Sequence, residues 1–125
     1  MFIGSRVVDL HVVDETSGKD YGVFKARIRD FDTELSVQLK VDALLAERGI
    51  EPDKASSSSR SLFYALALFA VTCEGVPNGE DPSKFAERLY HDQSPVDAFS
   101  FLGAYASALV KAEERFRQGP APSSE

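Results

Sequence analysis

The hydrophobic and polar positions of the chain divide it into strand-like and helix-like stretches. From Val7 to Val13 the apolar residues Val8, Leu10 and Val12 alternate with other residues, which is the period of a strand with one buried face. The same period returns from Tyr21 to Ile28, with Phe24, Ala26 and Ile28 on one side. The turn-forming residues between the two stretches predict an antiparallel β-hairpin. Lys25 and Arg27 on the other side of the second strand suit an exposed sheet edge.

Thr33 to Val41 fits two periods. Leu35, Val37, Leu39 and Val41 alternate as in a strand, yet Val37, Val41, Leu44 and Leu45 also form one stripe of a helix. Asp32 or Thr33 is suited to cap a helix, and Gly49 is suited to end it. We favour a helix from Thr33 to Arg48, and a third strand followed by a short helix is the alternative.

The stretch from Ser61 to Glu74 is the most apolar of the chain. Between Leu62 and Cys73 it holds no charge, so as a helix it is apolar on every side and predicts a central, surrounded element. The segment from Ile50 to Arg60, with Pro52 and four consecutive serines, predicts a linker whose last serines cap this helix.

Two further helices are expected after the turn at residues 75–80. Asp81-Pro82 and Ser94-Pro95 are both start signals, in which a capping side chain precedes proline at the first helical position. The first helix is expected to reach His91 and the second Arg117. The stripe of the second is predicted to be Phe99, Leu102, Ala106, Leu109 and Val110.

Together these elements predict one α+β domain over residues 1–117, a β-hairpin packed with a mainly helical part around the central helix. Residues 118–125, rich in proline and serine, are expected to form a disordered tail. The length of 125 residues and the 43% apolar content are those of an ordinary globular domain.

Net charge and composition argue against several classes of function. The net charge of −6 argues against nucleic-acid binding, which draws on clustered Lys and Arg. No stretch is long enough to predict a membrane span or a signal peptide, and the lone Cys73 forms no internal disulfide, so a reducing cytoplasm is the expected location.

Candidate chemistry is sparse. His11, His91 and Cys73 show no metal-ligand spacing, and an apolar setting makes Cys73 a poor nucleophile. Phosphate-binding glycine motifs are missing. We therefore expect no enzymatic activity, no metal and no cofactor. Apolar residues off the predicted core stripes are the candidate partner-binding residues, namely Phe2, Ile3, Val76, Phe101, Tyr105 and Phe116.

In layout the chain resembles the tail assembly chaperones of long-tailed bacteriophages. The resemblance rests on the strand pair from Val8 to Ile28, the helix entered at residues 29–33, the alanine-rich central helix leading into residues 74–77, and the paired C-terminal helices. That family has no catalytic signature, so no residue is carried over as catalytic.

The resemblance implies a chaperone that acts in the host cytoplasm. Its implied partners are the tape measure protein, whose hydrophobic segments it keeps soluble, and the tail tube protein. Assembly into a homo-oligomer is left open. The alternatives are a small acidic protein-binding adaptor, a secretion chaperone or a virion structural subunit, and third an unrecognised enzyme with a polar pocket containing Cys73, His11 or His91.

Overall fold

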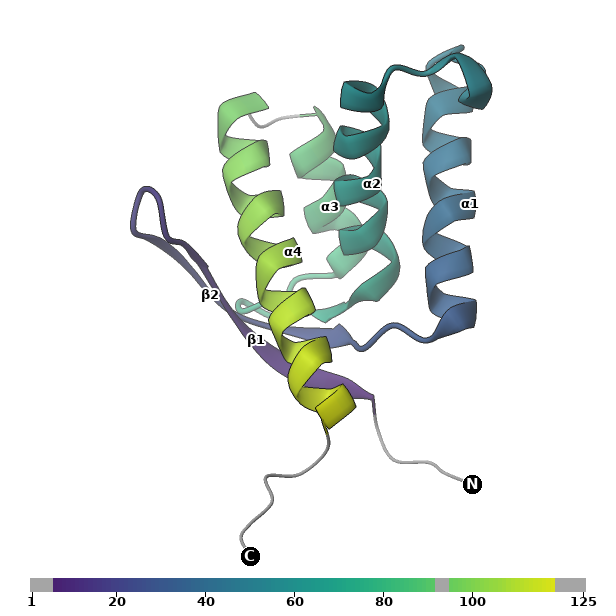
Figure 1. The fold of residues 1–125 in the computed structure, drawn as a ribbon. Helices are drawn as coiled ribbons and strands as arrows, with labels where there is room; N and C mark the ends of the chain where they lie inside the picture. Colours follow the sequence, from purple (N-terminus) through teal and green to yellow (C-terminus); the bar gives the residue numbers. More distant parts are fainter. Residues whose placement is uncertain (1–5, 92–94, 119–125) are drawn as a thin grey trace, which may run out of the picture.

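The computed structural model describes residues 6–91 and 95–118 of the chain. It has an α+β fold in which a small antiparallel sheet packs with helices (Figure 1). The elements are β1 (Val7–Asp14), β2 (Lys19–Arg27), α1 (Phe31–Glu47), the 3₁₀ turn η1 (Pro52–Lys54), α2 (Ser57–Thr72), β3 (Cys73–Gly75), α3 (Pro82–His91) and α4 (Pro95–Gln118). The expected tail therefore lies, apart from Gln118, outside the described residues.

The predicted hairpin is confirmed. β1 and β2 pair antiparallel, Leu10 lies opposite Phe24, and both of these side chains are buried. The third strand is not where the alternating pattern suggested. The favoured helix over Thr33 to Arg48 is confirmed as α1, and the alternative strand does not form there. The third strand is the short β3 directly after the central helix, so the strand order is β1-β2-β3. The prediction that β2 is a sheet edge is therefore wrong, because β3 pairs with its end.

Both long N-terminal helices begin before the residues predicted. The Asp30 carboxylate accepts a hydrogen bond from the Thr33 backbone N–H at 2.8 Å, so Asp30 caps α1 in place of Asp32 or Thr33. Ser56 caps α2 by accepting from the Ser59 N–H at 3.1 Å. The serine run is therefore the cap and first turn of α2 and not a linker. Its first hydroxyl can already accept a hydrogen bond from the free backbone N–H three residues later, so the helix begins where the run begins.

The surrounded central helix is confirmed in part. Ala67, Leu68 and Phe69 of α2 are buried, whereas Leu66 is half-buried and Ala70 is exposed. Leu66 and Ala70 line a cavity of about 440 Å³ to which α1 and α3 also contribute. α2 therefore keeps one open strip along an otherwise enclosed helix.

Five aromatic rings form the centre of the core. Phe69 of α2 lies 4.9 to 6.2 Å, centroid to centroid, from rings contributed by β2, α3 and α4. The members of this aromatic cluster are Phe24, Phe69, Phe85, Phe101 and Tyr105. Five of the nine ring contacts in the cluster are edge-to-face, an arrangement that the ring quadrupoles favour, and the other four are tilted. The cluster joins the sheet to three helices.

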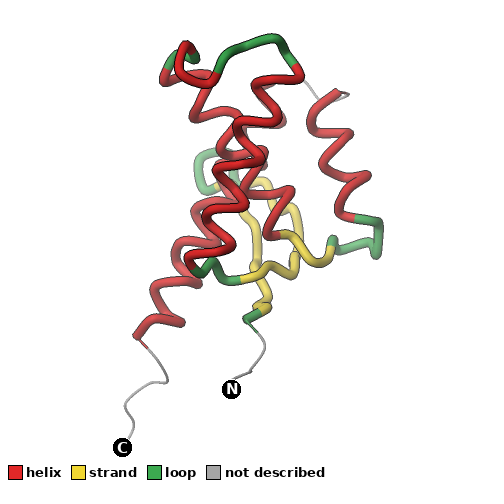
Figure 2. Tube along the Cα trace, turned by 90° about the vertical axis from the view of Figure 1, so that its right-hand side faces the viewer, coloured by secondary structure: helices red, strands yellow, loops and turns green. Residues whose placement is uncertain are grey.

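The elements are arranged so that α1 is the outermost helix. Figure 1 shows α2 between α1 and α4, with α3 behind α2 and the hairpin beside α4. In the view turned by 90°, the strands lie together against the helices (Figure 2). Because α1 packs mainly on α2, its opposite side faces away from the rest of the described protein.

Candidate functional site

The six candidate partner-binding residues do not form a common surface. Val76, Phe101 and Tyr105 are buried at 8%, 2% and 1% exposure, so their assignment to the surface is wrong. Phe116 is 44% exposed, and the Arg6 guanidinium lies over its ring at 5.0 Å from the centroid. Phe2 and Ile3 lie outside the described residues.

The buried face of α4 is rotated about the helix axis from the face that the sequence predicted. Leu102 and Leu109 of the predicted stripe are buried, at 1% and 0% exposure, as expected. Phe99 and Val110 of the same stripe are 51% and 42% exposed, and Phe101 and Tyr105 face the aromatic cluster in their place. α4 carries apolar residues on two sides, and both sets have helical spacing. The side with two large rings is buried because Phe24, Phe69 and Phe85 offer them ring partners.

The exposed apolar surface that sequence reasoning missed lies on α1. Phe31, Leu35 and Leu39 are 82%, 48% and 61% exposed, and we call these three residues the α1 outer stripe. Their spacing of four residues puts them on one side of the helix, about 130° around the axis from the core residues Val37, Val41, Leu44 and Leu45, at 100° per residue. The signal was present in the sequence, but Leu35 and Leu39 also fitted the competing strand pattern.

The charges beside the α1 outer stripe are acidic. Asp32 and Asp42 lie on the same side of α1 as the stripe, whereas Lys40 lies on the opposite side by the same helical geometry. Large apolar side chains at more than 40% exposure in a row, edged by acids, are typical of an interaction surface and not of scattered surface residues.

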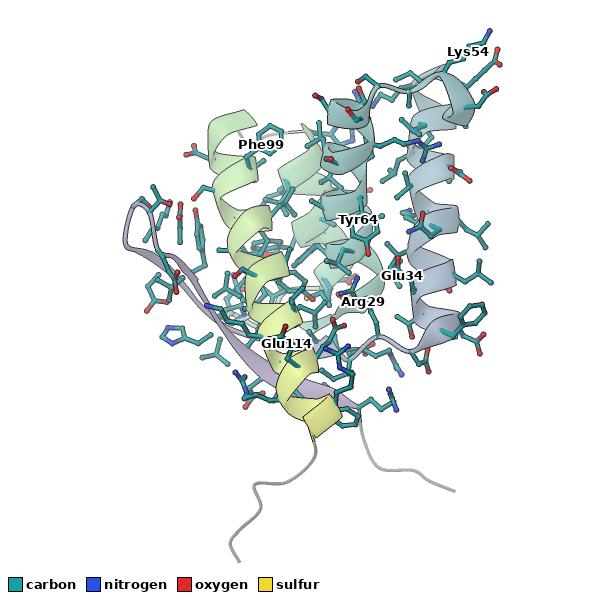
Figure 3. The ribbon with its side chains drawn as sticks, viewed as in Figure 1. Arg29, Glu34, Lys54, Tyr64, Phe99 and Glu114 are labelled. Carbon is teal, nitrogen blue, oxygen red and sulfur yellow. The ribbon has the colours of Figure 1, made fainter. Side chains whose placement is uncertain are left out.

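Beside the stripe, a polar cluster fastens α1 to the rest of the protein. The Arg29 guanidinium donates two hydrogen bonds to the Glu113 carboxylate, at 2.7 and 2.6 Å, and two more to Glu34 and the Tyr64 hydroxyl, at 3.0 and 2.6 Å. We call these four residues the Arg29 clamp. Figure 3 shows Arg29, Glu34 and Tyr64 pointing toward one another between α1 and α2. The clamp thereby links the β2–α1 connection to α1, α2 and α4.

The electrostatics of the Arg29 clamp are those of a structural ion pair. Burial alone would raise the pKa of the Glu113 carboxyl, but hydrogen bonds from the Arg29 guanidinium and backbone N–H outweigh it and hold that pKa below its usual range. The hydrogen bonds to Glu113 raise the pKa of Arg29 further. Four of the five N–H groups of the Arg29 guanidinium donate to acceptors within the cluster, at least one from each nitrogen, which is the bonding of a side chain that holds elements together.

The residues that an enzyme hypothesis requires in one pocket lie apart. His11 is on the outer face of β1, where its Nε2 is 2.8 Å from an Asp20 carboxylate oxygen, and His91 lines a different cavity at the end of α3. Cys73 is buried, and burial raises the pKa of its thiol to about 11. Over residues 6–91 and 95–118, no group of three or more His, Cys, Asp or Glu side chains is placed to hold a metal ion.

None of the described helices combines the length and the apolar character that crossing a bilayer would require. Comparison of the chain with protein-family models, with curated proteins and with solved structures finds no match.

Proposed function

We propose that this chain is a non-enzymatic chaperone that holds an apolar helical segment of a client protein on the α1 outer stripe. The observation that carries the proposal is the row formed by Phe31, Leu35 and Leu39, which faces away from the core on the outermost helix. Residues four apart on a helix meet the matching residues of a second helix laid against it, which is the usual way in which amphipathic helices are bound.

The acidic flanks define the client further. Asp32 and Asp42 favour a helix whose apolar stripe is edged by Lys or Arg, since opposite charges at a rim speed association and disfavour acidic partners. The net charge of −6 keeps such a complex soluble while the apolar surfaces are covered.

The resemblance to tail assembly chaperones suggests which protein provides the segment. In that reading the client is the tape measure protein, the second partner is the tail tube protein, and binding takes place in the host cytoplasm. The alternative is that the same stripe serves a small acidic adaptor, a secretion chaperone or a virion structural subunit, whose partner is not a tape measure protein.

Coexpression with a long helical tape measure protein tests the proposal. The double variant Leu35→Glu/Leu39→Glu places two charges on exposed positions, so it is expected to fold while client capture falls by about tenfold or more. The matched control is Val23→Glu/Val110→Glu, at residues 49% and 42% exposed on other faces, and it is expected to capture the client normally.

Circular dichroism and the melting temperature of each variant verify that it is folded. The proposal fails if the α1 variant captures the client as well as the control does, or if the client remains soluble without the chaperone. Capture of other helical proteins with rejection of the tape measure protein would support the adaptor alternative instead.

A further inference from the structure

A second surface, independent of the α1 outer stripe, lies along the free edge of β1. Among the described strands β1 pairs only with β2, so its other edge has no strand neighbour. The Ile28 N–H donates to the Arg6 carbonyl at 2.7 Å, which makes that pair a hydrogen-bonded pair. Such pairs alternate along an antiparallel ladder, so Val8 and Leu10 direct their backbone groups to β2. The backbone N–H and C=O of Asp9 and His11 point to the free edge.

A groove of about 740 Å³ runs between this edge and α4. Small residues of α4 line its middle, namely Gly103, Ala104, Ser107 and Ala108. Phe99 lies at one end and Arg115 at the other. A Cβ added to Gly103 would meet no other atom within 4 Å, so the middle of the groove is open.

The direction of α4 relative to β1 follows from two contacts. The Ser100 hydroxyl donates to the Asp14 carboxylate, which joins the start of α4 to the end of β1. The end of α4 lies near the start of β1, where the Arg6 guanidinium lies over the Phe116 ring. α4 thus runs antiparallel to β1, and Arg115 lies beside the first residues of the strand.

One charged side chain that lines the groove lacks a partner among the described residues. Asp9 pairs with Lys25, His11 with Asp20, and Glu15 with Lys111, while Asp14 accepts hydrogen bonds from Ser17 and Ser100. Of the charged residues that line the groove, Arg115 alone has neither an ion pair nor a side-chain hydrogen bond within the described part of the chain. A carboxylate of a bound ligand is the group that would pair with the Arg115 guanidinium.

We propose that this groove binds an extended segment of a partner protein, which adds to β1 as an antiparallel strand and places an acidic side chain near its C-terminal end against Arg115. Antiparallel addition uses the outward backbone groups of Asp9 and His11, and it carries the C-terminal end of the segment to the start of β1. Alternate side chains of the segment face α4, where an apolar residue at the N-terminal end meets Phe99 and smaller residues lie over Gly103 and Ser107.

A second copy of this chain fits the edge less well. Paired strands lie about 4.8 Å apart, whereas packed helices need about 8–10 Å between their axes. α4 packs chiefly along β1, so two-fold pairing of β1 strands would bring two α4 helices closer than their side chains allow. A single strand needs only the space that the groove provides.

The test is an NMR titration of the ¹⁵N-labelled full chain with the peptide acetyl-Phe-Thr-Val-Thr-Val-Thr-Glu-amide. We expect shifts at the Asp9, His11, Gly103 and Ser107 amides, and slower hydrogen exchange at the Asp9 and His11 amides. A peptide ending in Lys in place of Glu is expected to bind about tenfold more weakly, and Arg115→Glu is expected to reverse that preference.

Gly103→Leu fills the groove at an exposed helical position, so it is expected to fold normally and to weaken binding by about tenfold or more. Ala46→Leu adds a similar side chain to exposed α1 and is expected to change nothing. The proposal is overturned if the shifts appear on α1 instead, if Gly103→Leu binds as the wild type does, or if no peptide of the set binds. Concentration-dependent shifts at β1 without peptide, together with a doubled mass in sedimentation, would identify a second copy as the occupant and also overturn it.

Discussion

Replacing Arg29 by Met is the sharpest test of how α1 is held in place. The Arg29 and Glu113 side chains are 19% and 15% exposed, and two hydrogen bonds of 2.7 and 2.6 Å join them. Removing one partner of a fully buried pair costs about 3–5 kcal/mol, because the other charge is left without compensation. Since both side chains keep some solvent contact, we expect a loss of about 3 kcal/mol, at the lower end of that range. This is a large share of the roughly 5–15 kcal/mol that stabilises a typical domain.

The measurement is urea unfolding followed by circular dichroism at a series of pH values. Because the pKa of Glu113 is lowered in the folded state, its stabilising contribution is complete well above its ordinary pKa of 4.5 and is lost as the pH falls through the folded value. In the Arg29→Met variant, burial favours the protonated form of the Glu113 carboxyl. The stability difference between wild type and variant is therefore expected to be largest near pH 7 and to narrow as the pH falls toward and below 4.5.

Two further variants separate the Arg29 clamp from a general loss of charge. Arg27→Met removes an exposed pair with Glu74, whose side chains are 46% and 39% exposed, and is expected to cost about 1 kcal/mol or less. Arg29→Met/Glu113→Met replaces both charges by apolar groups and is expected to recover most of the loss. If Arg29→Met costs no more than Arg27→Met, or if its deficit does not change with pH, the reasoning about the clamp is wrong.

Three more predictions concern the core, a helix cap and the cysteine. Phe69→Ala is expected to cost about 3–5 kcal/mol in urea unfolding because it leaves a cavity inside the aromatic cluster, whereas Phe99→Ala, at a residue 51% exposed, should cost far less. Asp30→Ala is expected to cost about 1 kcal/mol and more than Asp32→Ala, and equal losses would contradict the assignment of Asp30 as the cap. Cys73 is expected to react with a thiol reagent at pH 8 only slowly until urea unfolds the protein, because its thiol is buried and its pKa is raised to about 11. Rapid labelling of the folded chain would contradict that expectation.

The pattern of residues along the chain determined the elements themselves. Period-two alternation located β1 and β2 with their inward residues, and capping signals located α3. The apolar run of residues 62–72 indicated the helix on which the core is built. These features depend on contacts within a few residues, so the order of residue types is enough to predict them.

Only the tertiary structure decided which apolar faces are covered. α1 and α4 each carry two apolar stripes of helical spacing, and spacing alone does not say which stripe meets a neighbour. Phe101 and Tyr105 are buried because Phe24 and Phe69 lie opposite them, and the α1 outer stripe is exposed because α1 packs on one side only. The Arg29 clamp joins residues 84 positions apart, and the groove beside β1 exists because α4 returns along the first strand of the chain. Burial of a face is a property of the neighbours it acquires, and those neighbours are set by the packing of the whole chain.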